Sequence, residues 1–115
     1  MNNAKVSVII PVYNTEDYVA DAIKSIQSQS LLDIEIIIIN DGSTDRSLQV
    51  AEALASADSR IHLINQENKG SSYARNEGIR CAGGEYVYFM DSDDLLSPDA
   101  LQHCYEKCKK DTLDF

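Results

Sequence analysis

The feature that most constrains the fold is an unbroken run of four isoleucines at residues 36–39, directly after Glu35. β-branched side chains favour extended backbone, so the run predicts a strand. Because the run is apolar at every position instead of alternating, that strand must be covered on both faces, which is typical of a parallel sheet. The run is also far shorter than the ~20 apolar residues that cross a bilayer. The sequence therefore predicts a buried strand of a parallel sheet at residues 35–39.

The segments around this run alternate between strand and helix patterns. β-branched and aromatic stretches predict strands, and apolar residues spaced at i, i+3, i+4 and i+7 predict helices. Such alternation implies crossover connections, and hence an α/β fold with an open, mainly parallel sheet and helices on both faces. Strands are predicted at 6–10, 35–39, 61–64 and 86–90, and helices at 15–26, 48–55, 72–82 and 98–108.

Residue types that favour helix ends stand near three of these boundaries. Side-chain oxygens and acids suit helix starts, whereas glycine suits helix ends because it tolerates left-handed backbone. A serine followed by proline is typical of a first turn. The predicted ends are Thr15 with Glu16 and Asp17 for the first helix, Gly83 and Gly84 after the third, and Ser97 and Pro98 before the last.

The length of 115 residues is that of one small domain, and 43% apolar with 25% charged residues is ordinary for a soluble globular protein. The last five residues, "DTLDF" at 111–115, have the pattern of another strand beginning. A compact sheet does not normally stop at such a point. We therefore expect a truncated fold, in which residues 1–115 form one part of a larger domain.

The charge and the cysteines restrict the partners and the compartment. The formal net charge is −9 and no basic patch is visible, which argues against a nucleic-acid partner. The chain has three cysteines, and its start lacks the apolar stretch and small-residue cleavage site of a signal peptide. We therefore expect free thiols in the reducing environment of the cytoplasm.

Polar residues follow all four predicted strands. Ligands of open parallel sheets bind beyond the carboxyl ends of the strands, so these segments are expected to meet at one edge. The glycine-rich motifs of Rossmann and P-loop nucleotide sites are absent from the sequence. The four segments are "PVYN" at 11–14, "NDGSTD" at 40–45, "NQENKG" at 65–70 and "DSDD" at 91–94.

The acidic segment is the strongest candidate for a metal site. Asp91 and Asp93 alternate directly after an apolar strand, and Asp94 follows them. Two carboxylates at this spacing are suited to a hard cation such as Mg²⁺ or Mn²⁺. The alternative is that one aspartate caps a turn while the others are solvated. Asp93 and Asp91 are the preferred ligands, and Asp94 is interpreted as a turn residue.

Three further residues allow both a structural and a functional interpretation. Asp41 can form an Asx-turn with Gly42, or accept hydrogen bonds from a ligand's base or sugar. Tyr13 can pack, or it can stack on a planar base. Arg75 can be a solvated surface residue, or it can bind a phosphate near the aspartates.

The remaining metal-type residues favour structure over chemistry. Cys104 and Cys108 share one helix face, but two ligands do not make a soft-metal site, so core packing is preferred. An EF-hand counted from Asp91 would need glycine and glutamate where Leu96 and Gln102 stand. A phosphatase of the haloacid-dehalogenase type carries similar acids after its first strand, and a non-catalytic nucleotide-binding module also remains open.

Four segments in fixed order carry a resemblance to a known family. They are "VSVIIPVYN", "IIIINDGSTD", "NKGSSYARNEGI" and "GEYVYFMDSDD". Together they resemble the N-terminal nucleotide-binding half of family 2 glycosyltransferases of the GT-A fold. The resemblance implies a metal-dependent, inverting, hexosyltransferase-like enzyme that transfers a sugar from a nucleoside diphosphate donor, commonly UDP-linked. The implied acceptor is a saccharide or a lipid-linked molecule, as in cell envelope polysaccharide synthesis at the inner face of the membrane.

The resemblance also implies a role for individual residues on the base side of the site. By position, Pro11, Val12, Tyr13 and Asn14 wrap the nucleotide base, with the Tyr13 ring stacked on it. Asp41 is implied to hydrogen-bond the edge of the base.

On the phosphate side, the resemblance implies that Arg75 approaches the base or the phosphate, and that Asp91 and Ser92 lie near the ribose and the metal. Asp93 is implied to be the main protein ligand of Mn²⁺ or Mg²⁺. The general base of the family lies in a later segment, so no catalytic base is expected within these 115 residues, and the segment alone need not be active.

Overall fold

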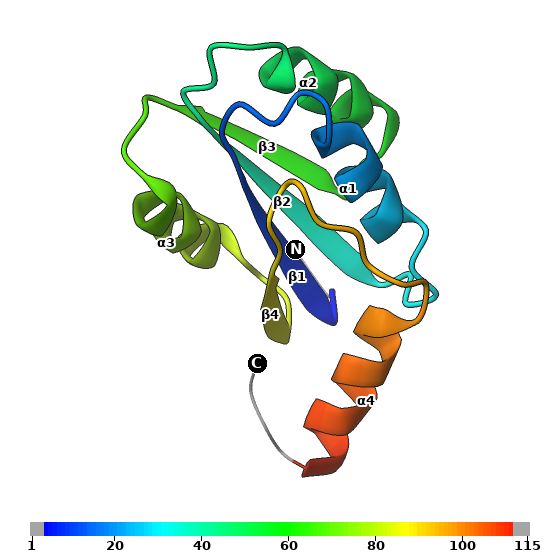
Figure 1. The fold of residues 1–115 in the computed structure, drawn as a ribbon. Coiled ribbons are helices and arrows are strands. Elements are labelled where there is room, and N and C mark those ends of the chain that lie inside the picture. The colour runs from blue at the N-terminus through cyan, green and yellow to red at the C-terminus, as the bar shows by residue number, and fades with distance from the viewer. Residues whose placement is uncertain (1–3, 112–115) are drawn as a thin grey trace.

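The structure is a computed structural model that describes residues 4–111. It contains all four predicted strands and all four predicted helices in the predicted order (Figure 1). The elements are β1 Val6–Val12, α1 Val19–Gln27, β2 Ile34–Asp41, α2 Ser47–Ala57, β3 Ile61–Gln66, α3 Ser71–Cys81, β4 Tyr86–Phe89 and α4 Ala100–Asp111.

The strands form one sheet in the order β3-β2-β1-β4, and every neighbouring pair is parallel. β2 lies inside the sheet, where Ile36 pairs with Val8 of β1 and with Ile61 of β3. All eight residues of β2 are buried. The prediction of a parallel sheet around the isoleucine run is therefore confirmed, as is its α/β class.

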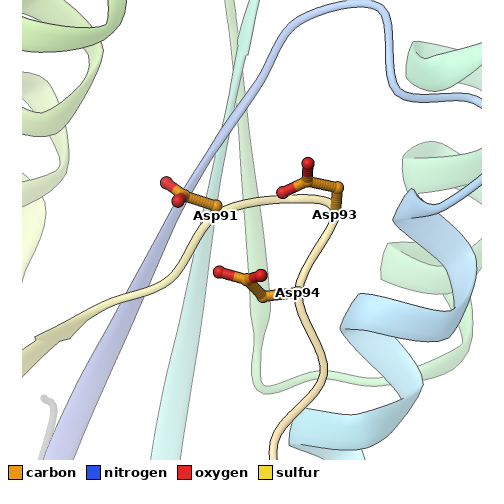
Figure 2. Close-up of side chains that lie close together, drawn as sticks. All are labelled: Asp91, Asp93 and Asp94. Atoms are coloured by element: carbon orange, nitrogen blue, oxygen red, sulfur yellow. The ribbon is translucent and has the colours of Figure 1, made fainter.

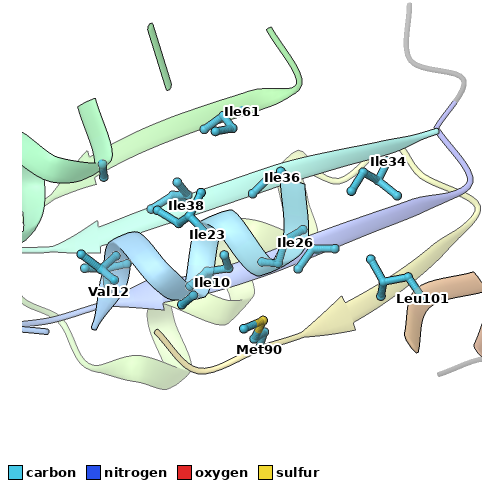
Figure 3. Packing of buried hydrophobic residues seen from close by; sticks show 14 of the residues in the cluster. Ile10, Val12, Ile23, Ile26, Ile34, Ile36, Ile38, Ile61, Met90 and Leu101 are labelled. Atoms are coloured by element: carbon cyan, nitrogen blue, oxygen red, sulfur yellow. The ribbon is translucent and has the colours of Figure 1, made fainter. Parts of the chain in front are cut away.

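Alternation along the strands divides the core into two layers, because successive side chains point to opposite faces of a sheet. Ile10, Ile36 and Ile38 face α1, where Ile23 and Ile26 pack on them (Figure 3). On the opposite face Ile9, Ile37 and Ile39 pack against Ala74 of α3. Figure 1 shows α1 and α2 on one side of the sheet and α3 on the other. Helices thus cover both faces, as predicted.

A glycine in the middle of α3 sets how closely this helix approaches the sheet. A Cβ atom added at Gly78 would lie 2.4 Å from Ile9 Cγ2 and 3.1 Å from Ile39 Cδ1. These separations are well below van der Waals contact, so no larger residue fits unless the helix moves. Gly78 therefore brings the backbone of α3 directly onto β1 and β2.

The predicted start of the first helix is wrong. α1 begins at Val19, and the Thr15 carbonyl accepts the backbone N–H of Val19 at 2.8 Å across a turn at 16–18. The Thr15 hydroxyl does not cap this helix. It donates instead to Ser92 Oγ at 2.8 Å, in the segment that follows β4. The hydroxyl that was predicted to cap the helix is therefore used in a tertiary hydrogen bond.

The other predicted helix ends also differ in detail. α3 ends at Cys81, and its C-cap is Ala82 in extended backbone instead of a glycine. Gly84 serves another purpose, since an added Cβ would lie 2.7 Å from the Ser7 backbone nitrogen where the chain enters β4. α4 begins at Ala100, directly after a turn that starts with Ser97 and Pro98. Another strand was predicted at 111–115. Its first residue, Asp111, is instead the last residue of α4, and the other four residues lie outside the described part of the chain.

None of the three cysteines forms a disulfide bond. Cys108 is buried, Cys104 is half-buried and Cys81 is exposed, so the preference for core packing is confirmed for Cys108. Within residues 4–111, the structure contains no helix with the length and apolar character that a membrane span requires.

Candidate functional site

The carboxyl ends of the strands meet around a cavity of about 380 Å³. Parallel strands end at the same edge of a sheet, so segments far apart in the sequence converge there. The prediction that the four polar segments form one edge is therefore confirmed. The lining residues are Pro11, Val12, Tyr13, Thr15, Asp41, Asn68, Gly70, Ser71, Arg75, Asp91, Ser92 and Asp93.

The cavity brings together every predicted site residue except Asn14. Asn14 follows Tyr13 directly, but it is absent from the lining. Sequence reasoning missed four lining residues, although each lies within or beside a segment that it singled out. Those residues are Thr15, Asn68, Gly70 and Ser71.

The acidic turn after β4 gathers three carboxylates. Asp91, Asp93 and Asp94 are exposed, and one oxygen of each lies within 4.8 Å of the others. Figure 2 shows the side chains of Asp93 and Asp94 turned toward Asp91. The Asp94 backbone N–H also donates to the Asp91 carbonyl at 3.1 Å, which closes the turn. Asp94 is thus a turn residue, as predicted, and it also adds a third carboxylate to the cluster.

This cluster fits a hard divalent cation. Mg²⁺ and Mn²⁺ prefer carboxylate oxygens, and Mg²⁺ is commonly held by one or two carboxylates together with water and phosphate oxygens. Convergent exposed carboxylates leave room for such additional ligands. Their mutual repulsion also favours a bound cation over an empty cluster.

The middle residue of the acidic motif has a different environment from its neighbours. Ser92 is only 5% exposed, and its hydroxyl accepts the hydrogen bond from Thr15. This contact joins the acidic turn to the loop that carries Tyr13. The two predicted halves of the site are therefore connected through a partly buried pair of hydroxyl groups.

Arg75 lies opposite the acidic turn, on α3. Its guanidinium Nη2 is 3.7 Å from Asp91 Oδ1, and both side chains are substantially exposed. An exposed pair at this distance contributes little to folding. Three carboxylates and one guanidinium thus line the cavity, so its lining carries a net negative charge.

Asp41 is a buried acid at this edge that accepts three hydrogen bonds. Its Oδ1 accepts Gln66 Nε2 at 3.0 Å and the Lys69 N–H at 2.8 Å, and its Oδ2 accepts the Gly70 N–H at 3.0 Å. Burial opposes ionisation of this 4%-exposed carboxyl, but the three hydrogen bonds outweigh it and lower the pKa of Asp41. Both oxygens are therefore engaged across the β3–α3 loop, and the carboxylate shapes the wall of the cavity.

The next residue brings two loops into backbone contact. Gly42 has φ +72°, a conformation that glycine adopts without cost, and an added Cβ would lie 2.6 Å from the Asn68 nitrogen. A side chain at this position would push the β3–α3 loop away. The glycine predicted as a turn residue is therefore also required by the close approach of Asn68.

Tyr13 is the aromatic residue of the cavity lining. Its side chain is 48% exposed although it belongs to the lining. A large aromatic side chain left this exposed beside a cavity offers a surface on which a planar group can stack.

A second cavity, of about 590 Å³, lies near the amino ends of the strands, away from every predicted site residue. Its buried acid, Glu35, accepts hydrogen bonds from Ser7 Oγ at 2.6 Å and the Gly83 N–H at 2.7 Å. His62 lies 3.6 Å from the same carboxylate. These contacts tie the entry of β4 to the sheet, and the His62 side chain is exposed. The buried acid of this cavity is therefore satisfied by contacts within the chain.

Comparison with known proteins identifies the fold. The Staphylococcus aureus TarS structure in complex with UDP matches with a TM-score of 0.84 and 30% identity over 92% of this chain and 32% of that chain. The mannosyltransferase PcManGT from Pyrobaculum calidifontis, in complex with GDP-Man and Mn²⁺, matches with a TM-score of 0.79 and 26% identity over 88% of this chain and 31% of that chain. The architecture is therefore that of GT-A glycosyltransferases.

The sequence comparisons agree. The glycosyltransferase EpsJ of Bacillus subtilis is 46% identical over 95% of this chain and 32% of its own length. Glycosyltransferase GlyG of Streptococcus pneumoniae is 37% identical over 95% of this chain and 36% of its own length. The chain thus spans about a third of the length of these relatives. The profile of glycosyl transferase family 2 matches residues 7–115, and the chain belongs to that family.

Proposed function

We propose that this segment is the N-terminal donor-binding part of an enzyme that transfers a sugar from a nucleoside diphosphate-sugar, with a UDP-sugar as the preferred donor. The observation that carries the proposal is the single cavity that joins an exposed tyrosine to a carboxylate cluster. Family membership supports it, as do the similar TarS structures in complex with UDP and with UDP-GlcNAc.

The cavity offers a distinct environment for each part of such a donor. The exposed Tyr13 ring suits a stacked base. Asp41 and Arg75 also line the cavity, and they supply a carboxylate and a guanidinium for the base, the ribose or a phosphate. Pro11, Val12 and backbone groups of the β3–α3 loop complete the wall.

The charge of the site makes a divalent ion necessary for this donor. A diphosphate is strongly anionic, and the lining itself carries more carboxylates than cations. Asp93 and Asp91 are the proposed metal ligands, with Asp94 beside them. A bound Mn²⁺ or Mg²⁺ supplies Lewis-acid stabilisation of the charge that grows on the leaving diphosphate. We therefore expect nucleotide binding to be weak without the ion.

In this proposal the residues of the segment bind and orient the donor, and they do not supply the catalytic base. They bind the donor, orient its base and hold the carboxylates at the diphosphate end. An inverting displacement also needs a base that deprotonates the acceptor hydroxyl. We propose that this base and the site for a saccharide or lipid-linked acceptor lie outside the segment, at the cytoplasmic face of a membrane.

A calorimetric titration with UDP, GDP, CDP and dTDP, each with and without Mn²⁺, tests the proposal. We expect UDP to bind with Mn²⁺, and its affinity to fall by more than tenfold in Asp93→Asn, because that change removes a charged ligand of the proposed metal site. Asp33→Asn is the matched control, since Asp33 is an exposed acid near the second cavity.

Two outcomes would overturn the proposal. One is the absence of binding for all four nucleotides, both with and without Mn²⁺. The other is hydrolysis of a chromogenic phosphate that is lost in Asp91→Asn, because that result indicates a phosphatase with an aspartyl nucleophile.

A further inference from the structure

Asn14 has an unusual backbone conformation beside the proposed base site. Its φ is +52°, and within residues 4–111 it is the only residue other than glycine with a positive φ. Asparagine tolerates this left-handed region better than most residues, but it still needs compensating contacts to be held there. The conformation turns the chain sharply just after Tyr13, at the end of β1.

The compensating contacts come from the β2–α2 loop. Asn14 Oδ1 accepts the backbone N–H of Thr44 at 2.8 Å and that of Asp45 at 3.3 Å. In return, the Asn14 backbone N–H donates to Ser43 Oγ at 3.1 Å. The Asn14 side chain therefore turns toward the neighbouring loop, which agrees with its absence from the cavity lining.

The residues after Asn14 continue this connection. The Thr15 N–H donates to Ser47 Oγ at 2.9 Å, and the Glu16 N–H donates to Asp45 Oδ2 at 3.1 Å. The backbone N–H groups of three consecutive residues are thus satisfied by side chains of the β2–α2 loop and of the first residue of α2, and the Asn14 side chain accepts hydrogen bonds from that loop in return. We call these contacts the loop latch. They account for the serine and the second aspartate of the "NDGSTD" segment.

The latch has a consequence for Tyr13. The Tyr13 side chain is 48% exposed, so packing restrains it far less than it restrains a core aromatic. Its direction depends on the backbone on either side, which is β1 before it and the latched Asn14 after it. Ordering such an aromatic before the ligand arrives lowers the entropic cost of stacking.

We propose that Asn14 is a positioning residue for the donor base: it makes no contact with the nucleotide, and it acts by fixing the Tyr13 ring through the loop latch. The inference rests on the proposed function, because it presumes that a nucleotide base stacks on Tyr13. It differs from the role implied by the family resemblance, in which Asn14 itself wraps the base.

A double-mutant cycle in the full chain tests the inference, with UDP and Mn²⁺ as the calorimetric probe. Tyr13→Ala is expected to weaken UDP binding by roughly 5- to 150-fold, the range found for bases stacked on aromatic side chains. Asn14→Ala is expected to weaken it by about 5-fold in the wild-type chain, but by less than about 2-fold in Tyr13→Ala, because coupled neighbours are not additive.

Two further variants distinguish the effect of the Asn14 side-chain acceptor from the effect of the positive φ at this position. Asn14→Asp keeps an acceptor oxygen for Thr44 and Asp45, so its UDP affinity is expected to stay within about 2-fold of the wild type. Asn14→Gly tolerates the positive φ but has no acceptor, so it is expected to bind as weakly as Asn14→Ala. Circular dichroism and thermal melts verify that each variant is folded.

The outcomes distinguish the inference from the proposed function. If wild-type chain binds no nucleotide, the proposed function fails. If wild-type chain binds UDP and Asn14→Ala loses the same factor with and without Tyr13, Asn14 acts independently of the ring and the inference is wrong. A large loss in Asn14→Asp would also contradict it, since an added charge harms a direct contact with an anionic ligand more than it harms a latch.

Discussion

Replacing Asp41 with asparagine tests whether its carboxylate holds the β3–α3 loop against the sheet. The carboxylate receives Gln66 Nε2 and the N–H groups of Lys69 and Gly70, and it is 4% exposed. An amide retains only one oxygen. If that oxygen takes the place of Oδ1, the amide nitrogen faces the Gly70 N–H, and two donors oppose each other.

The expected cost follows from these three hydrogen bonds. A hydrogen bond to a charged group contributes about 1.5–3 kcal/mol, and one between neutral groups about 0.5–1.5 kcal/mol. Asp41→Asn loses the bond from Gly70 and weakens the bonds from Gln66 and Lys69. We therefore expect the free energy of unfolding to fall by about 2–4 kcal/mol, a large part of the 5–15 kcal/mol typical of a domain.

Urea unfolding followed by circular dichroism measures this difference, with Asp33→Asn as the exposed control. The pKa of Asp41 is lowered from its ordinary value of 3.8, so its stabilisation is present above that value and is lost as the pH falls through the lowered pKa. The stability of Asp41→Asn should therefore decline less on acidification than that of the wild type. A variant as stable as the control at neutral pH would refute the account of Asp41 as the residue that holds this loop.

Three further changes have defined outcomes. Gly78→Ala should destabilise the chain in urea, because overpacking against Ile9 costs about 1–3 kcal/mol while the helix gains only about 1 kcal/mol; higher stability would mean that α3 is not closely packed. Arg75→Ala should leave the melting temperature unchanged, since its pair with Asp91 is exposed, yet weaken UDP binding in calorimetry; a clear drop in melting temperature with unchanged affinity would assign it a structural role. Asp58 has a pKa lowered to about 2, first by the hydrogen bond from Arg60, so Asp58→Asn should flatten the loss of stability measured between pH 4 and pH 2, and an unchanged slope would contradict this.

The fold was predictable because its main signals are local. The unbroken isoleucine run predicted a strand covered on both faces, and all of β2 is buried between helices. Helix starts were less predictable, because they depend on contacts distant in the sequence. Thr15 has the right chemistry for an N-cap, but its hydroxyl bonds Ser92, which lies 77 positions further along the chain.

The site was predictable to the extent that strand ends determine it. Ligands bind beyond the carboxyl ends of parallel strands, and this rule predicted one common site there. Tyr13, Arg75 and Asp93 do line one cavity. The partners of Asp41 and Asn14 were not predictable, since their donors come from neighbouring loops whose conformation no local pattern describes. The sequence therefore indicates which residues meet, whereas the structure shows which of them hold the others in place.

The most direct test of the central claim is to map nucleotide binding residue by residue. Amide NMR spectra of the nitrogen-labelled chain would be recorded during a titration with UDP and Mg²⁺. We expect the largest shifts at Tyr13, Asp41, Arg75 and Asp93, which line one cavity formed by the carboxyl ends of the strands. Shifts clustered instead around the second cavity near His62, or no shifts at saturating UDP and Mg²⁺, would contradict the account.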